Sequence, residues 1–515
     1  MEIRIVVKKD TYYDSVTLMI VSGKVTSLNG VEEAVVAMAT PLNKELLEHV
    51  GLLTNQVEEA KPDDLIIAIK ADDESVCDEA VRVAEEAMSL KATDRNKEGQ
   101  IAPSSIGSAV TMMPEANLAI ISVPGAYAAR EAMQALKKGL HVMMFSDNVS
   151  LADELVLKQY AHENGLLMMG PDCGTAIINN SGLCFANAVN SGNIGIVGAS
   201  GTGTQEVSVL IDSFGGGVTQ VLGTGGRDLY EEIGGIMMLD CLAALNDDEE
   251  TKVIVLISKP PAKSVVEKIL AEVRKVEKPV VVCFINGDSA EVEKAGAYFA
   301  KTLEEAAYKA VELSKGEDEI TLPREEEVSL EKVAPGVVKL ESGQKYVRGL
   351  FCGGTLCDEA LHIVQAKVGK VYSNVSKTSD TKLQDPHVSK ENSFIDLGDD
   401  VFTVGKPHPM IDPSLRLPRI IEEAKDPEVA VILLDVVLGF GSHPDPAGIT
   451  LSAIEKAKQI AEKEGRHLEF IAYVCGTDRD PQNRSNQMEK LASAGVILAE
   501  SNAKAAQTAA AILSR

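Results

Sequence analysis

The chain has 515 residues, a formal net charge of −27, 45% apolar residues and 25% charged residues. This length predicts about three or four domains, and the composition is that of a globular protein. The acidic balance and the scarcity of aromatic side chains (4%, with no Trp) argue against nucleic-acid binding. No apolar run approaches a membrane span and the start lacks a signal-peptide pattern, so we expect a cytoplasmic protein without membrane contact. The eight cysteines form no C-x-x-C pair, which predicts reduced thiols and neither a disulfide framework nor a zinc site.

Residues 1–190 predict strands and helices that alternate along the chain. We divide them into a small α/β domain at 1–92, a polar linker over 91–108 and a second α/β domain at 109–190. The expected strands are 3–7, 34–39, 65–69, 118–123, 141–145 and 166–169, and the expected helices are 12–27, 41–49, 75–90, 126–138 and 151–164. In the second domain the strands are apolar without alternation, which predicts a parallel sheet covered on both faces and a Rossmann-like arrangement.

The remaining chain predicts two further α/β domains, at 191–315 and 346–515, joined by a Glu-rich linker at 316–345. The expected strands are 193–198, 218–222, 253–257, 280–284, 346–351, 394–397, 429–437, 470–474 and 496–498. Each domain opens with a strand, a loop that contains Gly and Thr, and a helix, and each closes with an Ala-rich helix. This repetition predicts two related flavodoxin-like domains with a duplicated site at their interface.

The most informative stretch is the glycine-rich turn after the strand at 193–198. Residues 198–203 read GASGTG, and a helix with apolar residues at positions 207, 210, 211 and 214 follows. Such a loop presents backbone N–H groups at the positive end of a helix dipole, which suits a phosphate or carboxylate. The same sequence also suits a plain strand-to-helix turn in which glycines only permit close packing. The predicted phosphate-binding residues are Ser200, Gly201, Thr202, Gly203 and Thr204.

Several other loops follow predicted strands, and ligands of parallel sheets bind at the carboxyl ends of strands. The candidate substrate-binding residues are Pro171, Asp172, Cys173, Gly225, Gly226, Asp478, Arg479 and Arg484, and the candidate catalytic residues are Arg227, Asp228, His408 and Asp412. The arginines suit either a bidentate clamp on an anion or a surface ion pair. His408 lies in a proline-rich loop and suits either acid–base chemistry or a loop hydrogen bond.

Two further residue groups carry alternatives of their own. Cys173 has no histidine near it in the sequence, which favours a small buried thiol over a nucleophile. Asp399 and Asp400 suit either Mg²⁺ beside a phosphate or a turn cap, and we predict no dedicated metal site.

Six longer segments carry a more specific resemblance. They are MMFSDNVSL (143–151), MGPDCGT (169–175), GNIGIVGASGTGTQE (192–206), GGRDL (225–229), FIDLGDDVFTVGKPHPMIDP (394–413) and GTDRDPQNRSNQ (476–487). With these segments the chain resembles the FdrA proteins, relatives of the succinyl-CoA ligase and ATP-citrate lyase superfamily. The resemblance covers nearly the whole chain from Leu18 onward.

This resemblance implies a part for each domain. Residues from about 114 to 190 are similar to the CoA-binding domain of the ligase α subunit, residues 191–315 to its ligase domain, and residues 346–515 to the carboxy-terminal domain of the β subunit. In those ligases two helix N-termini form the phosphate sites. The matching positions are residues 200–204 and, for the second site, Gly439, Phe440, Gly441 and Ser442.

The sequence departs from the ligases in two ways. Residues 286–302, which match the segment with the phosphorylated histidine, contain no histidine, and the linker at 316–345 leaves no room for an ATP-grasp domain. Phosphorolysis needs a phosphate cradle and an oxyanion stabiliser but no phosphohistidine. The resemblance therefore implies a subunit of an oxamate carbamoyltransferase, which converts oxalurate and phosphate to oxamate and carbamoyl phosphate in allantoin breakdown.

Two alternatives remain beside this reading. One is an NDP-forming acyl-CoA synthetase that works with a separate nucleotide-binding partner, and the other is a non-catalytic ligand-binding subunit. In each case we expect a small-molecule ligand and other enzyme subunits as partners. Phosphate is expected as a substrate, and CoA or a nucleotide are the open cofactor candidates.

Overall fold

The computed structural model describes residues 2–514 except 10, 12, 14, 27, 29, 41–42, 45–46, 48–49, 97–102, 104, 318–319, 323–338 and 404–405. Contacts divide the chain into two compact units, Met1–Ser104 and Ser105–Arg515. Each unit is a mixed α/β structure, which confirms the predicted fold class. Most of the helix predicted at 41–49 lies outside the described residues, as does most of the linker predicted at 316–345.

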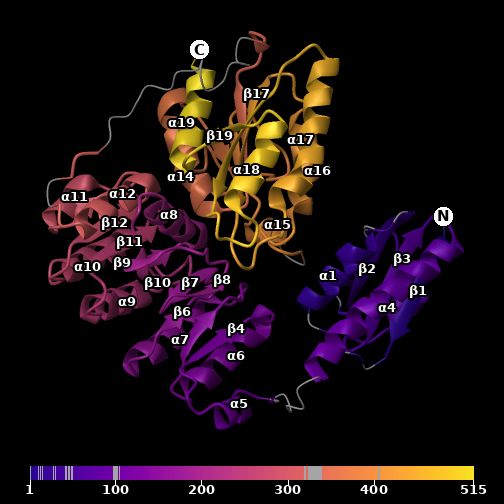
Figure 1. Ribbon diagram of the computed structural model, residues 1–515, viewed down its shortest axis with the longest axis horizontal. Helices are drawn as coiled ribbons and strands as arrows, with labels where there is room; N and C mark the ends of the chain where they lie inside the picture. Colours follow the sequence, from indigo (N-terminus) through magenta and orange to yellow (C-terminus); the bar gives the residue numbers. More distant parts are fainter. Residues whose placement is uncertain are drawn as a thin grey trace. The chain divides into compact units, whose positions relative to one another are not determined.

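Unit 1 is built on a three-stranded antiparallel sheet with the order β1-β3-β2. Its elements are β1 (Glu2–Lys8), α1 (Ser15–Thr26), β2 (Val31–Met38), α3 (Asn55–Glu59), β3 (Leu65–Ala71) and α4 (Glu74–Asn96). α1 and α4 cover one face of the sheet (Figure 1), and Leu47, Leu52 and, in α3, Val57 pack on the other. β3 is the central strand, and these two layers bury both of its faces.

Unit 2 begins with a small parallel sheet of order β4-β5-β6 and continues with a seven-stranded sheet. The elements of this part are α5 (Ile106–Met112), β4 (Leu118–Ile121), α6 (Gly125–Leu136), β5 (His141–Met144), α7 (Leu151–Glu163), β6 (Met168–Met169), β7 (Thr175–Ile178), β8 (Ser181–Cys184), β9 (Ser191–Ala199), α8 (Gly201–Ser213), β10 (Val218–Gly223), α9 (Ile236–Asp247), β11 (Val253–Ser258), α10 (Lys263–Val273), β12 (Val280–Phe284), α11 (Ser289–Lys294), β13 (Tyr298–Phe299) and α12 (Leu303–Ser314). The strands β13-β12-β11-β9-β10 are parallel, and the hairpin β7–β8 extends their sheet in antiparallel fashion.

The last part of unit 2 is a six-stranded parallel sheet of order β15-β16-β14-β17-β18-β19. Its elements are β14 (Tyr346–Phe351), α14 (Gly354–Val368), β15 (Tyr372–Ser373), β16 (Ser393–Asp396), α15 (Asp400–Thr403), η2 (Pro413–Leu415), α16 (Arg416–Glu423), β17 (Val429–Val437), α17 (Pro446–Lys463), β18 (Glu469–Cys475), α18 (Arg484–Ser493), β19 (Ile497–Ala499) and α19 (Asn502–Leu513). The strand that leads into the long interface helix is central in both sheets: β9 lies between β10 and β11, and β14 lies between β16 and β17.

The two large sheets share one hydrophobic core. Apolar residues of α8 and α12 from the first sheet and of α14 and α19 from the second belong to a single buried cluster (Figure 1). The first helix of each sheet, α8 or α14, is therefore covered by the other half of the unit. This arrangement brings the N-termini of α8 and α14 close to each other.

Three details differ from the sequence prediction. α4 continues to Asn96 and α5 begins at Ile106, so helix occupies much of the predicted linker at 91–108. The hairpin β7–β8 was not predicted, because each strand has only four residues and β8 carries Ser and Gly rather than a β-branched apolar run. The sequence from Cys352 predicts a Gly–Thr loop and a helix that ends at His362, whereas α14 extends six residues further to Val368 and is followed by Gly369 with a positive φ.

Candidate functional site between two helix N-termini

The first half of the site is the N-terminus of α8, which follows β9 as the sequence predicts. Ser200 is the N-cap, and its side chain accepts a hydrogen bond of 3.0 Å from the backbone N–H of Gly203. The first N–H groups of an α-helix have no carbonyl partner within the helix. The N–H groups of Gly201 and Thr202 are therefore the donors that α8 offers to an anion.

The second half is the N-terminus of α14, where no side chain caps the helix. The N–H groups of Cys352 and Gly353 each donate a 2.8 Å hydrogen bond to the buried carboxylate of Asp435 in β17. Asp435 also accepts from Arg416 at 3.1 Å, so the turn from β14 to α14 is anchored to the centre of its sheet. The N–H groups of Gly354 and Thr355 follow this anchored turn and are left to a ligand or solvent.

The two N-termini touch each other. The hydroxyl oxygens of Ser200 and Thr355 lie 2.6 Å apart, within hydrogen-bonding distance. A Cβ atom on Gly353 would come within 2.8 Å of the Thr202 side chain, and one on Gly203 within 2.9 Å of the Thr355 methyl group. Glycine is needed at both positions for the close approach, and two positive helix ends therefore point into one region.

A cation and an anion flank the N-terminus of α14. A Cβ atom on Gly354 would lie 2.6 Å from Nζ of Lys259, which follows β11, and 2.3 Å from Oδ2 of Asp396, at the end of β16. Lys259 forms no hydrogen bond or ion pair with any residue that the structure describes. Burial opposes its charge, but the carboxylates of Asp396 and Asp358 outweigh this and raise the pKa of Lys259. Burial raises the pKa of Asp396 to about 6, and Lys259 moderates this effect.

His408 lies beside the same region. A Cβ atom on Gly398 would come within 2.6 Å of its Nε2 and 3.2 Å of Oδ1 of Asp396. Nδ1 accepts a 3.2 Å hydrogen bond from the N–H of Met410, and burial lowers the pKa of His408 to about 4. The imidazole is therefore neutral near pH 7 with its proton on Nε2, which makes it a hydrogen-bond donor toward the site. The acid–base role predicted for His408 stays a prediction.

The other predicted catalytic residues have structural partners. Asp412 caps η2 by accepting a 3.0 Å hydrogen bond from Ser414 N–H. Arg227 donates to Val149 O at 2.8 Å and pairs with Glu154 at 2.8 Å. Asp228 is fully buried, where it pairs with Lys158 at 2.8 Å and accepts from Met238 N–H at 2.8 Å. These contacts tie α7 to the start of α9.

The predicted substrate loops at 170–173 and 225–226 do meet. A Cβ atom on Gly225 would lie 2.3 Å from the carbonyl oxygen of Pro171, and one on Gly226 would lie 3.9 Å from Oδ2 of Asp172. The surrounding protein and the Asp147 and Asp400 carboxylates raise the pKa of Asp172 to about 7. Cys173 is buried, and its thiol donates to Gly223 O at 3.3 Å. Burial raises the pKa of that thiol to about 12, which favours the structural role over a nucleophile.

The second predicted phosphate loop differs from expectation. No helix begins at Gly439, Phe440, Gly441 or Ser442, and α17 begins only at Pro446. The N–H groups here are already used, since Gly439 donates to Gln482 Oε1 at 3.3 Å and Phe440 to Ala186 O at 3.0 Å. The helix end that opposes α8 belongs instead to α14. The repeated pattern SGTGTQE (200–206) and GGTLCDE (353–359) carried this signal in the sequence.

Asp478, Arg479 and Arg484 lie together after β18, where they line a cavity of about 300 Å³ with Tyr473 and Glu500. Arg479 binds Asn190 and Asp212 of the first sheet's half, and Asp478 accepts from Ser485 N–H at 2.7 Å. Their predicted role in substrate binding stays a prediction. Lys259, Asp396 and Asp435 were not among the predicted site residues, because a single lysine or aspartate after an apolar strand carries no distinctive signal.

Comparison with known proteins places these features in a family. Residues 350–512 match the CoA-ligase family, residues 189–287 the CoA binding domain, and residues 1–103 the AllF, heavy metal-associated domain. The uncharacterized protein YahF of Escherichia coli K12 is 53% identical over 507 residues, which cover 98% of this chain and 97% of that protein. The chain belongs to the YahF family.

More distant relatives of this YahF-family chain are named ligases and lyases. Subunit alpha 2 of the ADP-forming succinate–CoA ligase of Archaeoglobus fulgidus is 31% identical over 172 residues, which cover 32% of this chain and 58% of that subunit. Among solved structures, the ATP citrate lyase of Methanosaeta concilii with (3S)-citryl-CoA has a TM-score of 0.36 at 18% identity and covers 45% of each chain. The matches bear out the likeness to the succinate–CoA ligases, but the CoA binding domain model falls on residues 189–287 and not on the predicted CoA-binding domain at 109–190.

The description of the first domain mentions a heavy metal, but the residues of unit 1 do not fit one. Cys77 is its only cysteine, and this buried thiol lies 3.6 Å from Glu2 O as a hydrogen-bond donor. Burial also raises the pKa of Cys77, which disfavours the thiolate that a metal needs. Among the described residues no group of His, Cys, Asp and Glu side chains is arranged to hold a metal ion.

In the described part of the chain no helix combines the length and the apolar character that crossing a membrane requires.

Proposed function

We propose that the chain is an acyl-CoA-synthetase-type enzyme subunit that holds a phosphoryl group between the N-termini of α8 and α14. The observation that carries this proposal is the direct contact of the two helix ends at Ser200 and Thr355. Backbone N–H groups of both helices and the free ammonium group of Lys259 then surround one anion. A binding site of this composition suits a phosphate, an acyl phosphate or the tetrahedral oxyanion between them.

In this reaction the thiol sulfur of CoA attacks the carbonyl carbon of an acyl phosphate. The C–O bond to phosphate breaks, inorganic phosphate leaves, and the thiol proton passes to solvent or phosphate. Helix N–H groups stabilise the charge on the carbonyl oxygen and on the departing phosphate. The step needs no histidine, and residues 286–302 contain none. The matches to the CoA-ligase family and the CoA binding domain support CoA as the thiol.

A second candidate is carbamoyl transfer from oxalurate to phosphate. A phosphate oxygen attacks the carbamoyl carbon, the C–N bond breaks, and oxamate leaves with a proton. The neutral His408, with its proton on Nε2 next to Asp396, favours this candidate because it offers a donor to a leaving amide nitrogen. Both candidates share the phosphate site and differ in the acyl donor and the acceptor.

Phosphate binding can be tested by removing one backbone donor. The Gly201→Pro variant lacks one N–H group, and proline suits the first position of a helix. Ser200 has φ −167° and ψ 119°, an extended conformation that a following proline accepts. We expect the phosphate affinity, measured by calorimetry, to fall about tenfold or more, since a hydrogen bond to a charged group contributes about 1.5–3 kcal/mol.

The matched control is Gly201→Ala, which keeps the N–H group. The only neighbour of a Cβ atom there is Gly174 Cα at 3.9 Å, so the methyl group fits. Equal affinity in all three proteins would refute the phosphate site. Activity assays with the full chain and its partner subunits then separate the candidates: thioester formed from an acyl phosphate and CoA supports the first, and oxamate formed from oxalurate and phosphate supports the second.

A further inference from the structure

β1 is an edge strand with an open side. It pairs with β3 along seven residues without a bulge, and within the described residues no strand pairs with its other side. Six of the seven residues of β3 are buried, whereas no residue of β1 is. The open side therefore presents a row of backbone N–H and C=O groups to which another strand can add.

The usual protections of an edge strand are weak in β1. Its sequence EIRIVVK has no proline, and Ile3 is 48% exposed. The charge of Arg4 in the middle of β1 is neutralised within the unit, because Arg4 pairs with Glu74 and Asp78, whereas the pair of Lys8 with Glu85 is exposed and leaves Lys8 accessible to another strand. An exposed apolar strand of this kind indicates a surface that another strand covers.

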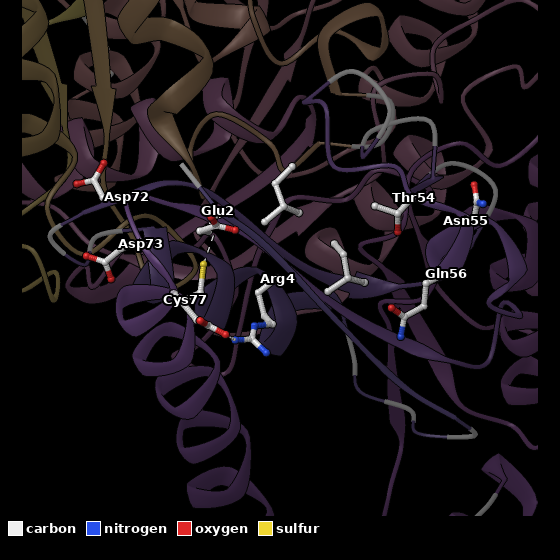
Figure 2. A pocket seen from close by; sticks show the side chains of 11 residues that line it. Glu2, Arg4, Thr54, Asn55, Gln56, Asp72, Asp73 and Cys77 are labelled. Carbon is white, nitrogen blue, oxygen red and sulfur yellow. Dashed lines mark hydrogen bonds and ion pairs between the residues drawn. The ribbon is translucent and has the colours of Figure 1, made fainter.

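A groove of about 970 Å³ runs beside the first half of β1. Thr54, Asn55 and Gln56 at the start of α3 line one side, and Asp72 and Asp73, with Glu74 at the start of α4, line the other (Figure 2). Glu2, Asp72, Asp73 and Glu74 give the lining four carboxylates against the single cation of Arg4. The groove therefore suits an incoming strand with a basic end.

We propose that β1 pairs in antiparallel fashion with β1 of a second copy of this chain, with the two Ile5 residues opposite each other. In this register Glu2 lies opposite Lys8 of the second copy, and Ile3 lies opposite Val7 of the second copy. In a β-strand the N–H and C=O groups of every second residue point to the same side. Each pair of opposed residues in this register is both odd or both even in number, so the outward-facing backbone groups of one strand meet those of the other.

The charges select a second copy as the occupant. The end of β1 that enters the acidic half of the groove carries Lys8 and Lys9. These lysines of one copy meet Glu2, Asp72 and Asp73 of the other, and the two-fold axis repeats the match. The two three-stranded sheets join into one six-stranded sheet, and both open edges at β1 disappear.

Cysteine cross-linking of the full chain tests the register. Ile5→Cys places two thiols opposite each other at the two-fold axis, within reach of a disulfide. We expect Ile5→Cys to form a covalent dimer under mild oxidation, and Ile3→Cys and Val7→Cys to do so only when the two variants are mixed. Two Ile3 residues lie about 13 Å apart in this register, at about 3.3 Å per residue. Wild type reports the background from the native cysteines, seven of which are buried.

Charge exchange tests the recognition independently. Glu2→Lys and Lys8→Glu each place like charges opposite each other, and the double variant restores opposite charges. By sedimentation we expect each single variant to raise the dimer dissociation constant at least tenfold and the double variant to recover it. Thermal unfolding reports whether Lys8→Glu disturbs the fold by losing its pair with Glu85. If Lys8→Glu disturbs the fold, the Glu2→Lys variant alone tests the charge recognition.

Several results would overturn the proposal. They are a wild-type chain that stays monomeric at high concentration, equal cross-linking of all three cysteine variants, and a double variant as weak as the single ones. Protection of the β1 amides from hydrogen exchange only after another protein is added would also overturn it, since the occupant would then be a different strand. These readouts do not involve phosphate or CoA, so they stand apart from the tests of the proposed function.

Discussion

A buried carboxyl between the two large sheets gives a testable pH dependence. Glu206 in α8 is fully buried at the interface, where Oε1 accepts a 3.2 Å hydrogen bond from Asn502 N–H at the start of α19. Within the part of the chain that the structure describes, Oε2 has no hydrogen-bond partner. Burial and the nearby Glu359 raise the pKa of Glu206 to about 8, from an ordinary value of 4.5.

The sign and size of the effect follow from this pKa. Because the pKa is raised in the folded state, the contribution to stability is complete below about pH 4.5 and is lost as the pH rises through about 8. At about 1.4 kcal/mol per pH unit, the loss has an upper limit on the order of 5 kcal/mol. Relaxation of the interface and entry of water reduce this value, so we expect a few kcal/mol.

Thermal unfolding of the full chain between pH 5 and pH 9 measures the effect. Glu206→Gln keeps the size and the carbonyl acceptor but carries no charge at any pH. We expect the wild type to lose stability relative to Glu206→Gln as the pH rises from 5 to 9, by several degrees in the unfolding temperature. The matched control is Glu312→Gln in α12, which removes only a surface pair with Lys315 and should follow the wild type. Parallel pH profiles for wild type and Glu206→Gln would refute the reasoning.

Three other substitutions probe the site and its surroundings. Lys259→Met should lower phosphate-dependent turnover about tenfold to a hundredfold, because it removes an ammonium group that forms no hydrogen bond or ion pair with the described residues, and circular dichroism should show that the fold is retained; an unchanged rate would remove Lys259 from the site. Lys158→Met should destabilise the chain by about 3–5 kcal/mol in chemical denaturation, since it leaves the buried Asp228 without its cation and Glu154 with Arg227 alone; a neutral result would contradict the importance of this ion pair. Cys173→Ser should keep full activity, and mass spectrometry should find Cys173 unmodified after alkylation of the native chain at pH 8; rapid alkylation would revive the nucleophile hypothesis.

The sequence predicted the local elements of the site better than the residues that these elements contact across the fold. The strand–turn–helix at 193–214 was readable because glycines and helical apolar spacing coincide there, and β9, Ser200 and α8 follow it closely. The opposing helix end was missed, since the resemblance pointed to residues 439–442, which carry as many glycines as residues 353–355, whereas the N–H groups of Gly439 and Phe440 bond within the protein. Asp228 illustrates a second limit: its place after Gly225 and Gly226 suggests chemistry, but only the fold shows Lys158 beside it. Pairing across 70 residues leaves no trace in local pattern.

The buried glutamates link the stability of the interface to the geometry of the site. Glu206 of α8 accepts from the start of α19, in the other half, and Glu359 of α14 accepts from Leu303 N–H at the start of α12 at 2.8 Å. Each of the two helices that form the site therefore caps a helix of the opposite half. The capping glutamate lies six residues after the N-cap of its own helix, which is Ser200 in α8 and Gly353 in α14. Burial raises the pKa of Glu359 to about 7, so ionising either buried carboxyl costs the folded state free energy as the pH rises through about 7 and about 8. Because Ser200 and Thr355 meet only while this interface is closed, phosphate affinity should fall together with stability as the pH rises, and Glu206→Gln should reduce both changes.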